Sequence, residues 1–116
     1  MNYETVISKI DTPDGNQRVI KKYQNTGDII NDLVECFKLY NYQAAPVAAM
    51  FAGHNTTETG RNIYDFIKNN IAYNAEPDRN QTTRSFARII NDKSGDCKHT
   101  ALTVASIGWQ LGYNVI

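Results

Sequence analysis

The segment from Cys97 to Leu111 is the most apolar stretch of the chain, and it constrains the fold more than any other feature. Its apolar residues cover most of the circumference of a helix, which is typical of a helix that is buried on several sides. The small side chains of Ala101 and Ala105 allow neighbouring elements to approach closely, and Trp109 is expected in the core. Gly112 is a natural end for this helix because glycine adopts the left-handed conformation of a C-cap without steric cost. We therefore expect one central helix around which the rest of the chain packs.

Length and composition place the chain among small globular proteins. Its 116 residues, 41% of them apolar, are enough for one domain with one modest core. The 12 basic and 12 acidic side chains balance, which gives no reason to expect a nucleic-acid or anionic-membrane partner. The longest nearly apolar run, 44–53, is far shorter than the roughly 20 residues of a membrane span, and the N-terminus lacks the pattern of a secretory signal. Two cysteines are too few for a disulfide scaffold, so a reducing, cytoplasmic location is expected.

Residues 1–25 are predicted to form a β-hairpin. The arms, 3–10 and 17–24, are rich in β-branched and aromatic residues. Between them, 11–16 contains a proline that restricts φ and a glycine that permits positive φ, as turns require.

Residues 26–112 are predicted to be helical. Apolar residues recur there at the spacing of one helix face, with capping residues and prolines at the expected starts. Polar residues at 74–82 predict a loop, and 113–116 has the character of an opening strand. The fold class is therefore α+β and mainly helical, in a single domain 1–116. The helices are expected at 26–42, 46–52, from 57–60 to about 71, at 83–91 and at 97–111.

The start of the central helix carries the strongest chemical signal. A Gly95–Asp96 turn places Cys97 in the first helical turn, where the helix dipole favours thiolate over thiol. The backbone N–H groups of Asp96, Cys97 and Lys98 are candidates for holding the oxyanion that forms on an attacked carbonyl. The glycine leaves room for a substrate to reach the sulfur. These are the requirements of a thiol nucleophile in acyl transfer.

The residues around Cys97 resemble a known family. Gly95–Ala101, followed by Ala105–Ser106 and then Leu111–Val115, looks like the nucleophile helix of the transglutaminase-like superfamily. The upstream segment Ile63–Tyr73 looks like the helix that precedes it in that family. The resemblance extends over roughly Asn62–Ile116, about half of the chain.

The resemblance implies a papain-like α+β core with a Cys-His-Asp triad that cleaves or forms amide bonds in peptides or proteins. Cys97 matches the nucleophile. In the family the His and Asp lie on strands after this helix, and nothing in 1–116 matches them. We therefore expect the chain to be the N-terminal portion of a longer transglutaminase-like domain, inactive by itself because a cysteine without its base loses most of its catalytic power. The alternative is a non-catalytic structural or binding module, for example a component of a phage particle or a larger complex.

Several other residues are weaker candidates. His99 lies two residues after Cys97, on a different face of the helix, so a structural hydrogen bond is favoured over a catalytic dyad. His54 is expected in an exposed turn, and Gln43 is a remote candidate for an oxyanion donor. Cys36 lies beside apolar residues, so core packing is expected.

The remaining residues indicate no cofactor or metal. The two histidines and two cysteines lack the close spacing of metal ligands. Asp96 is explained as the cap of the central helix, although its charge opposes thiolate formation. Arg84 and Arg88 form an i, i+4 pair with weak potential for binding an anion. An unpaired strand at 113–116 predicts self-association through its edge.

Overall fold

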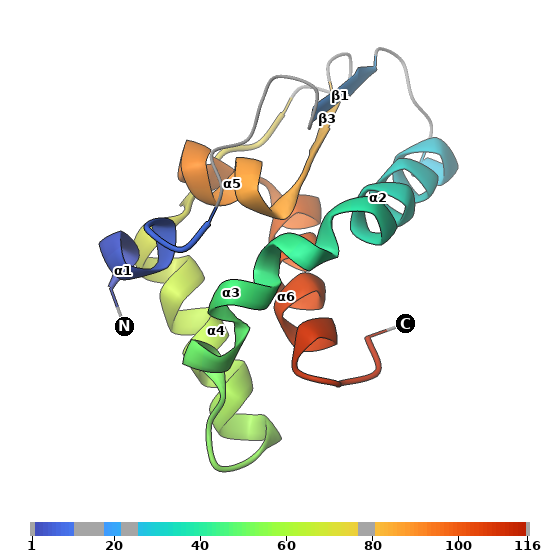
Figure 1. Cartoon of the computed structure of the whole chain (residues 1–116). Coiled ribbons are helices and arrows are strands. Elements are labelled where there is room, and N and C mark those ends of the chain that lie inside the picture. The colour runs from blue at the N-terminus through green and yellow to red at the C-terminus, as the bar shows by residue number, and fades with distance from the viewer. Residues whose placement is uncertain (1, 11–17, 22–25, 77–80, 116) are drawn as a thin grey trace.

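The fold is mainly helical with a small β component, which confirms the α+β expectation (Figure 1). The computed structural model describes residues 2–10, 18–21, 26–76 and 81–115. Within these residues, none of the helices combines the length and apolar character that a membrane span requires. In chain order the elements are α1 (Tyr3–Ile7), β1 (Arg18–Lys21), α2 (Thr26–Tyr40), η1 (Asn41–Ala44), α3 (Ala45–Ala48), η2 (Ala49–Phe51), α4 (Thr56–Asn70), β2 (Ala72–Tyr73), β3 (Gln81–Arg84), α5 (Phe86–Asp92), β4 (Ser94–Gly95) and α6 (Cys97–Gln110).

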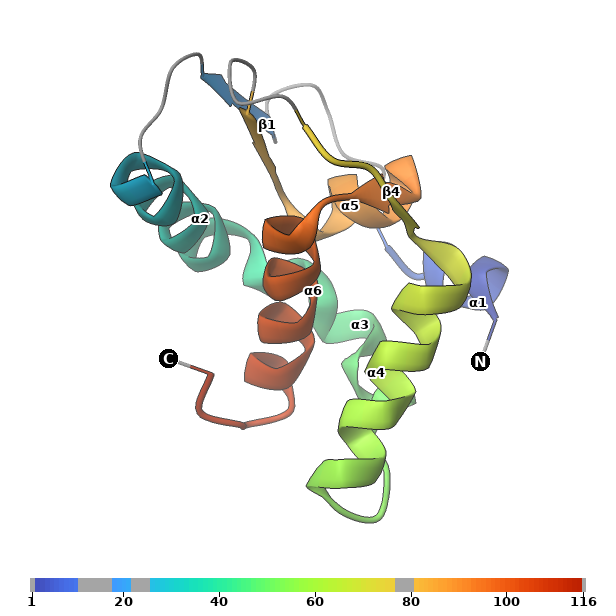
Figure 2. The same cartoon turned by 180° about the vertical axis from the view of Figure 1, so that it is seen from behind.

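Helix α6 is the central element, as its apolar sequence predicts. Figure 2 shows it between α2 on one side and α4 on the other. Its buried residues contribute to two apolar clusters: Ile107 belongs to the larger one and Leu102 to the smaller one. The smaller cluster joins Leu102 to Cys36 and Phe37 of α2 and to Ile89 of α5. Because α6 contributes to both clusters, it holds the two sides of the molecule together.

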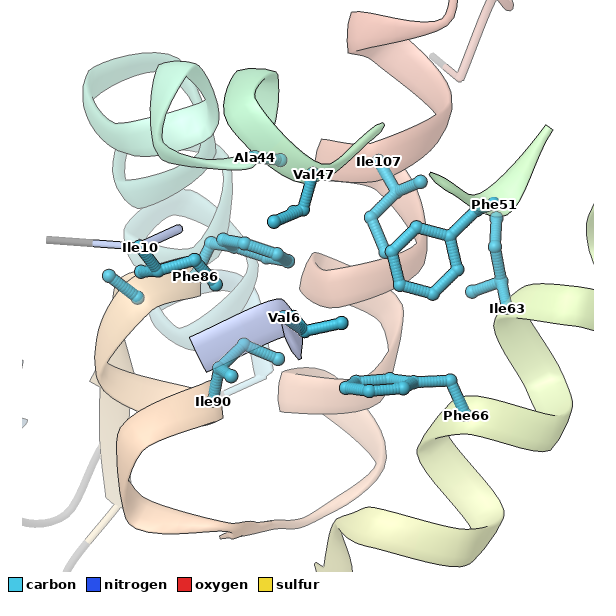
Figure 3. Close-up of a cluster of buried hydrophobic side chains, with 11 residues drawn as sticks. Val6, Ile10, Ala44, Val47, Phe51, Ile63, Phe66, Phe86, Ile90 and Ile107 are labelled. Carbon is cyan, nitrogen blue, oxygen red and sulfur yellow. The ribbon is translucent and has the colours of Figure 1, made fainter. Parts of the chain in front are cut away.

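The larger cluster collects side chains from five helical regions (Figure 3). Ile107 of α6 and Phe51 of η2 are both fully buried, and the Phe51 ring meets that of Phe66 edge to face at 5.3 Å between centroids. Such aromatic pairs add stability beyond the area they bury. The other members are Val6, Ile10, Ala44, Val47, Ile63, Phe86, Ala87 and Ile90.

The predicted N-terminal hairpin is wrong for its first arm, because Tyr3–Ile7 is the helix α1. The Asn2 side chain accepts the backbone N–H of Thr5 at 2.8 Å and caps the helix. Val6 is fully buried in the larger cluster, and the Tyr3 hydroxyl donates to the carbonyl oxygen of Ile90 at 2.6 Å. Capping and burial thus override the β propensity of these residues. The expected turn at 11–16 lies outside the described residues.

Residues 18–21 do form a strand, β1, but its partner is not the N-terminal arm. β1 pairs antiparallel with β3, with Arg18 opposite Arg84 and Lys21 opposite Gln81. The expected loop at 74–82 therefore ends before β3, and the helix expected at 83–91 begins only at Phe86, after the Ser85 cap. A second pair, β2 with β4, is parallel and lies directly before α6. The local pattern could not show either pairing because the partners are distant in sequence.

The expected strand at 113–116 is absent from the described residues 113–115. Gly112, with φ of 89°, follows the last turn of α6. The N–H of Gly112 donates to the Trp109 carbonyl at 3.0 Å, and that of Tyr113 donates to the Gly108 carbonyl at 2.9 Å. This pair of bonds is a Schellman motif, which turns the chain back so that Val115 packs against the smaller cluster. The described segment therefore presents no strand edge for self-association.

Helix α6 is not buried all round, and this corrects the expectation for Trp109. The Trp109 side chain is 45% exposed and Val104 is 42% exposed. The face that α6 buries is instead formed largely by small or polar residues, including Thr103 and Ser106. An apolar stripe of α6 that begins at Cys97 therefore remains on the surface.

We expect replacement of Ile107 by Ala to lower the free energy of unfolding by about 3 kcal/mol, because it opens a cavity in the larger cluster. The control is Val104→Ala on the same helix, an exposed position where a change below about 1 kcal/mol is expected. Urea unfolding followed by circular dichroism measures both. Equal losses in the two variants would show that α6 does not pack as described.

Candidate functional site

Cys97 is the first residue of α6, and its side chain is exposed. Gly95 and Asp96 precede it and link α6 to the parallel β2–β4 pair, in which the Asn74 N–H donates to the Gly95 carbonyl at 2.8 Å. Because Cys97 is the first residue of a 14-residue helix, the partial positive charge of the α6 N-terminus acts at this position. The structure therefore places the Cys97 side chain at the N-terminus of α6 and accessible to solvent.

Asp96 is the N-cap of α6, as expected. Its Oδ1 accepts the backbone N–H of Lys98 at 3.1 Å and that of His99 at 3.4 Å. In return, the backbone N–H of Asp96 donates to Nδ1 of His99 at 3.1 Å. The two interactions form a capping box in which histidine occupies the position usual for Glu or Gln.

Lys98 neutralises the carboxylates around the start of α6. Its Nζ donates to Oε1 of Glu76 at 2.8 Å and makes a short ion pair with Oδ2 of Asp96. Burial by itself raises the pKa of Glu76, but the hydrogen bonds from Lys98 and Thr82 outweigh it and leave the pKa lowered. From the sequence, the charge of Asp96 is expected to disfavour a thiolate at Cys97. In the structure this charge is paired with the ammonium group of Lys98.

His99 is fully buried and structural, not a partner of Cys97. Two donors point at its Nδ1: the Asp96 N–H and Nη2 of Arg84, which lies 3.4 Å away. Nδ1 therefore carries the lone pair and the proton is on Nε2, which is buried without a hydrogen-bond partner among the described residues. Asp96 Oδ1, 3.0 Å from Nδ1, accepts backbone N–H groups instead. Burial, followed by the charge of Arg84, lowers the pKa of His99 to about 4, so the ring is neutral.

The hydrogen bonds around Asp96 and His99 correct the expectation that three backbone N–H groups are available to an oxyanion. The N–H groups of Asp96 and Lys98 are both occupied, by His99 and by the Asp96 carboxylate respectively. Among the described residues, only the Cys97 N–H of these three has no acceptor. The capping box therefore uses two of the donors that were assigned to an oxyanion. The absence of a side chain at Gly95 makes room for His99, because a Cβ there would lie 2.6 Å from the His99 Cβ.

The other sequence candidates do not join Cys97. Cys36 is buried on α2, where burial, together with the charge of Glu35, raises the pKa of its thiol to about 11. Both cysteines are free. Gln43 is buried, and its Oε1 accepts the N–H of Ala87 at 2.9 Å. The exposed His54 belongs to the segment between η2 and α4, at the end of α4 that lies away from the start of α6 (Figures 1 and 2).

Arg84 and Arg88 are not a helical pair, because Arg84 lies in β3 and Arg88 in α5. Both meet Asp92: Nη1 of Arg84 lies 2.8 Å from Oδ2, and Nε of Arg88 lies 3.4 Å from Oδ1. The guanidinium groups are therefore engaged with a carboxylate of the protein itself. Sequence spacing offered no signal for this cluster or for Glu76, which lies 22 positions before Lys98.

Glu76, Asp96 and His99 also have the composition of a metal-binding set. One ligand atom from each lies within 4.8 Å of the others. The ammonium of Lys98 bonds to both carboxylates, however, and the Arg84 guanidinium faces the imidazole. Two cations already occupy the surroundings of these ligands, and their positive charge opposes the binding of a metal ion there.

Comparison with known proteins adds no relative. No family model matches the chain, and no curated protein or solved structure shows significant similarity to it.

His99 should make stability depend on pH. A histidine in the unfolded chain titrates near 6.5, whereas the pKa of His99 in the fold is about 4. Between these values the unfolded chain binds a proton that the folded protein excludes. This contribution is therefore complete above pH 6.5 and is lost as the pH falls toward 4, by up to about 3 kcal/mol. Urea unfolding at pH 7, 6, 5 and 4.5 measures the loss. His99→Gln should flatten it, since Gln serves the capping box without titrating, and His54→Gln should not; identical slopes in both would contradict the assignment.

Lys98→Met should destabilise the protein at pH 7 by about 3–5 kcal/mol, because it leaves two partly buried carboxylates without their counter-charge. Part of this loss should be regained on acidification, as Glu76 becomes protonated. Lys38→Met, at an exposed position, provides the matched control. Thermal unfolding at pH 7 and pH 4.5 measures both, and a Lys98 variant as stable as the control would exclude a buried role for this ammonium.

Proposed function

We propose that this chain carries the nucleophile of a transglutaminase-like thiol acyltransferase or amidase, with Cys97 attacking an amide of a peptide or protein. The observation that supports this most is the exposure of Cys97 at the first position of α6. Cys36 differs from Cys97, because it is buried and its pKa is raised. In the proposal Cys36 is a packing residue and Cys97 is the nucleophile. The resemblance of Gly95–Ala101 to the nucleophile turn of that superfamily points to the same residue.

The surroundings of Cys97 suit an anionic sulfur. The α6 dipole contributes roughly half a positive charge at the helix start, and Lys98 compensates the neighbouring Asp96 carboxylate. The N–H of Cys97 is the donor available to the oxyanion. A second donor has to come from a group other than the N–H of Asp96 or Lys98, because the capping box holds both.

The proposed reaction is acyl transfer through a thioester. The Cys97 thiolate attacks the carbonyl carbon of the amide, and the C–S bond forms as the electron pair moves to oxygen. The C–N bond then breaks, and the amine leaves with a proton from an acid–base histidine. Water or a second amine attacks the thioester and gives a proton to the same histidine. The C–S bond then breaks, which releases the acid or the new amide and regenerates the Cys97 thiolate.

The acid–base histidine is not supplied by the described residues. His99 is buried and fixed, and His54 lies at the end of α4 away from the start of α6. In the proposal this histidine comes from elsewhere, as the superfamily resemblance implies, with an Asp to orient it. Two free cysteines, one of them exposed, suit a reducing compartment such as the cytoplasm.

A non-catalytic binding module is the second candidate. It is favoured by the use of two helix-start N–H groups in the capping box and by the absence of an imidazole beside Cys97 among the described residues. Translation of the gene beyond codon 116 separates the candidates. A downstream strand with His, followed by Asp or Asn, supports the enzyme, whereas a stop codon supports the module.

Iodoacetamide should alkylate Cys97 about two- to five-fold faster at pH 7 than a small free thiol, since a helix N-terminus stabilises an anion by about 0.3–1 kcal/mol. Cys36 in the same chain should react on the order of 100-fold more slowly than Cys97, because burial suppresses both its thiolate and its access. Mass spectrometry of the two tryptic peptides measures both rates, and Cys97→Ser should abolish the fast phase. A Cys97 rate no greater than that of the free thiol would overturn the nucleophile assignment.

A further inference from the structure

A groove of about 580 Å³ lies between α4 and α6, next to the start of α6, although Cys97 itself is not one of its lining residues. We refer to it as the α4–α6 groove. Gly95, Thr100 and Val104 line it on the side of Cys97. Residues of α4 form the opposite wall, among them Ile63 and Tyr64, and Tyr73 of β2 lies at the end near the β2–β4 pair. Its lining is largely apolar, yet it is open at the surface.

Helix geometry places Cys97 at the head of this groove. Thr100 and Val104 lie about 60° and 20° from Cys97 around the α6 axis, so the three residues share one face. Thr100 is about 4.5 Å and Val104 about 10 Å further along the axis. Since an extended peptide advances about 3.3 Å per residue, one to three residues of a peptide attacked at Cys97 would run along the groove.

Building on the function proposed above, we propose that the α4–α6 groove binds the acyl side of a peptide substrate that carries an apolar side chain next to an acidic residue. The apolar walls supply burial for the side chain. Two exposed tyrosines at the groove, Tyr64 at 61% and Tyr73 at 69%, offer broad contact surfaces with a polar end. The groove thereby determines which amide reaches the sulfur.

The acidic preference follows from the charge of the lining. Among the described residues that line the groove, Lys68 is the only charged one. Its Nζ lies 5.9 Å from the centroid of the Tyr64 ring, so the cation is held at the apolar wall. A carboxylate next to the apolar side chain would meet Lys68 without an opposing acidic lining residue.

A second apolar groove, of about 390 Å³, lies between α2 and α6 and suits the acyl chain less well. We refer to it as the α2–α6 groove. Its α6 wall begins at Ala101, one turn beyond Cys97, and Val115 from the returning C-terminal segment lines it. The α4–α6 groove is instead lined by Gly95, two residues before Cys97, and by Thr100, three residues after it.

Peptide chloromethyl ketones test the proposal, because the Cys97 thiolate displaces chloride and forms a stable C–S bond. Acetyl-Phe-Ala chloromethyl ketone should label Cys97 at least about ten-fold faster than acetyl-Gly-Ala chloromethyl ketone, as expected for burying one apolar side chain. Acetyl-Phe-Glu should react about two- to five-fold faster than acetyl-Phe-Lys, and Lys68→Glu should reverse that order.

The control variants are matched in exposure. Val104 of the α4–α6 groove is 42% exposed and Val34 of the α2–α6 groove is 45% exposed. Val104→Asp should abolish the preference for Phe, whereas Val34→Asp should leave it unchanged. Circular dichroism establishes that each variant folds, and Tyr64→Ala replaces Val104→Asp if that variant does not fold.

Each outcome decides one of the two proposals. The intrinsic reactivity of the thiol cancels in the ratio of the labelling rates of two peptides. This ratio therefore tests the groove, whereas the iodoacetamide rate tests the nucleophile. Equal labelling by the Phe and Gly peptides, or loss of the preference in Val34→Asp but not in Val104→Asp, overturns the groove assignment even where Cys97 reacts rapidly. A preserved ratio without enhanced iodoacetamide reactivity retains a peptide groove and removes acyl transfer.

Discussion

The buried ion pairing between Lys98 and the carboxylates of Asp96 and Glu76 holds the start of α6 in place. Charged groups are costly to bury unless they are paired and hydrogen-bonded. Here the two carboxylates share one ammonium, and the Asp96 side chain in turn caps the helix. The segment before β3 is thereby tied to the N-terminus of the central helix, and the position of Cys97 depends on that tie.

The same network bears on the proposed nucleophile, because Cys97 directly follows a carboxylate. Asp96 alone would disfavour an anion at Cys97. The Lys98 ammonium offsets the charge of Asp96, so the field of the α6 dipole acts on Cys97 without opposition from that carboxylate. The Asp96 carboxylate also accepts the backbone N–H of Lys98, which is therefore not available to an oxyanion. A backbone N–H that caps the helix start cannot at the same time bind an oxyanion. The N–H groups of Asp96 and Lys98 are both used to stabilise the helix start.

Helix α6 divides its surface between two roles. The side that faces α5 and the larger cluster is closely packed around Ile107 and includes the buried His99. The opposite side leaves Val104 and Trp109 partly exposed, although periodicity alone predicts burial for so apolar a helix. A hydrophobic residue on the surface needs no explanation when it is single. Val104 lies about 20° from Cys97 around the α6 axis and lines the α4–α6 groove, in keeping with the proposed peptide groove. Trp109 lies on another face and packs edge to face against Phe37 of α2.

The sequence by itself determined α2, α4 and α6, because apolar periodicity, caps and the Gly112 stop act over only a few residues. It also determined that Cys97 begins a helix. Only the tertiary structure decided that Tyr3–Ile7 is helical, that β1 pairs with β3, and that the C-terminal segment folds back instead of forming a strand. It alone decided that Glu76 meets Lys98 and that His99 supports the cap rather than the thiol. These outcomes depend on burial and charge pairing between residues far apart in the chain, which no local pattern encodes.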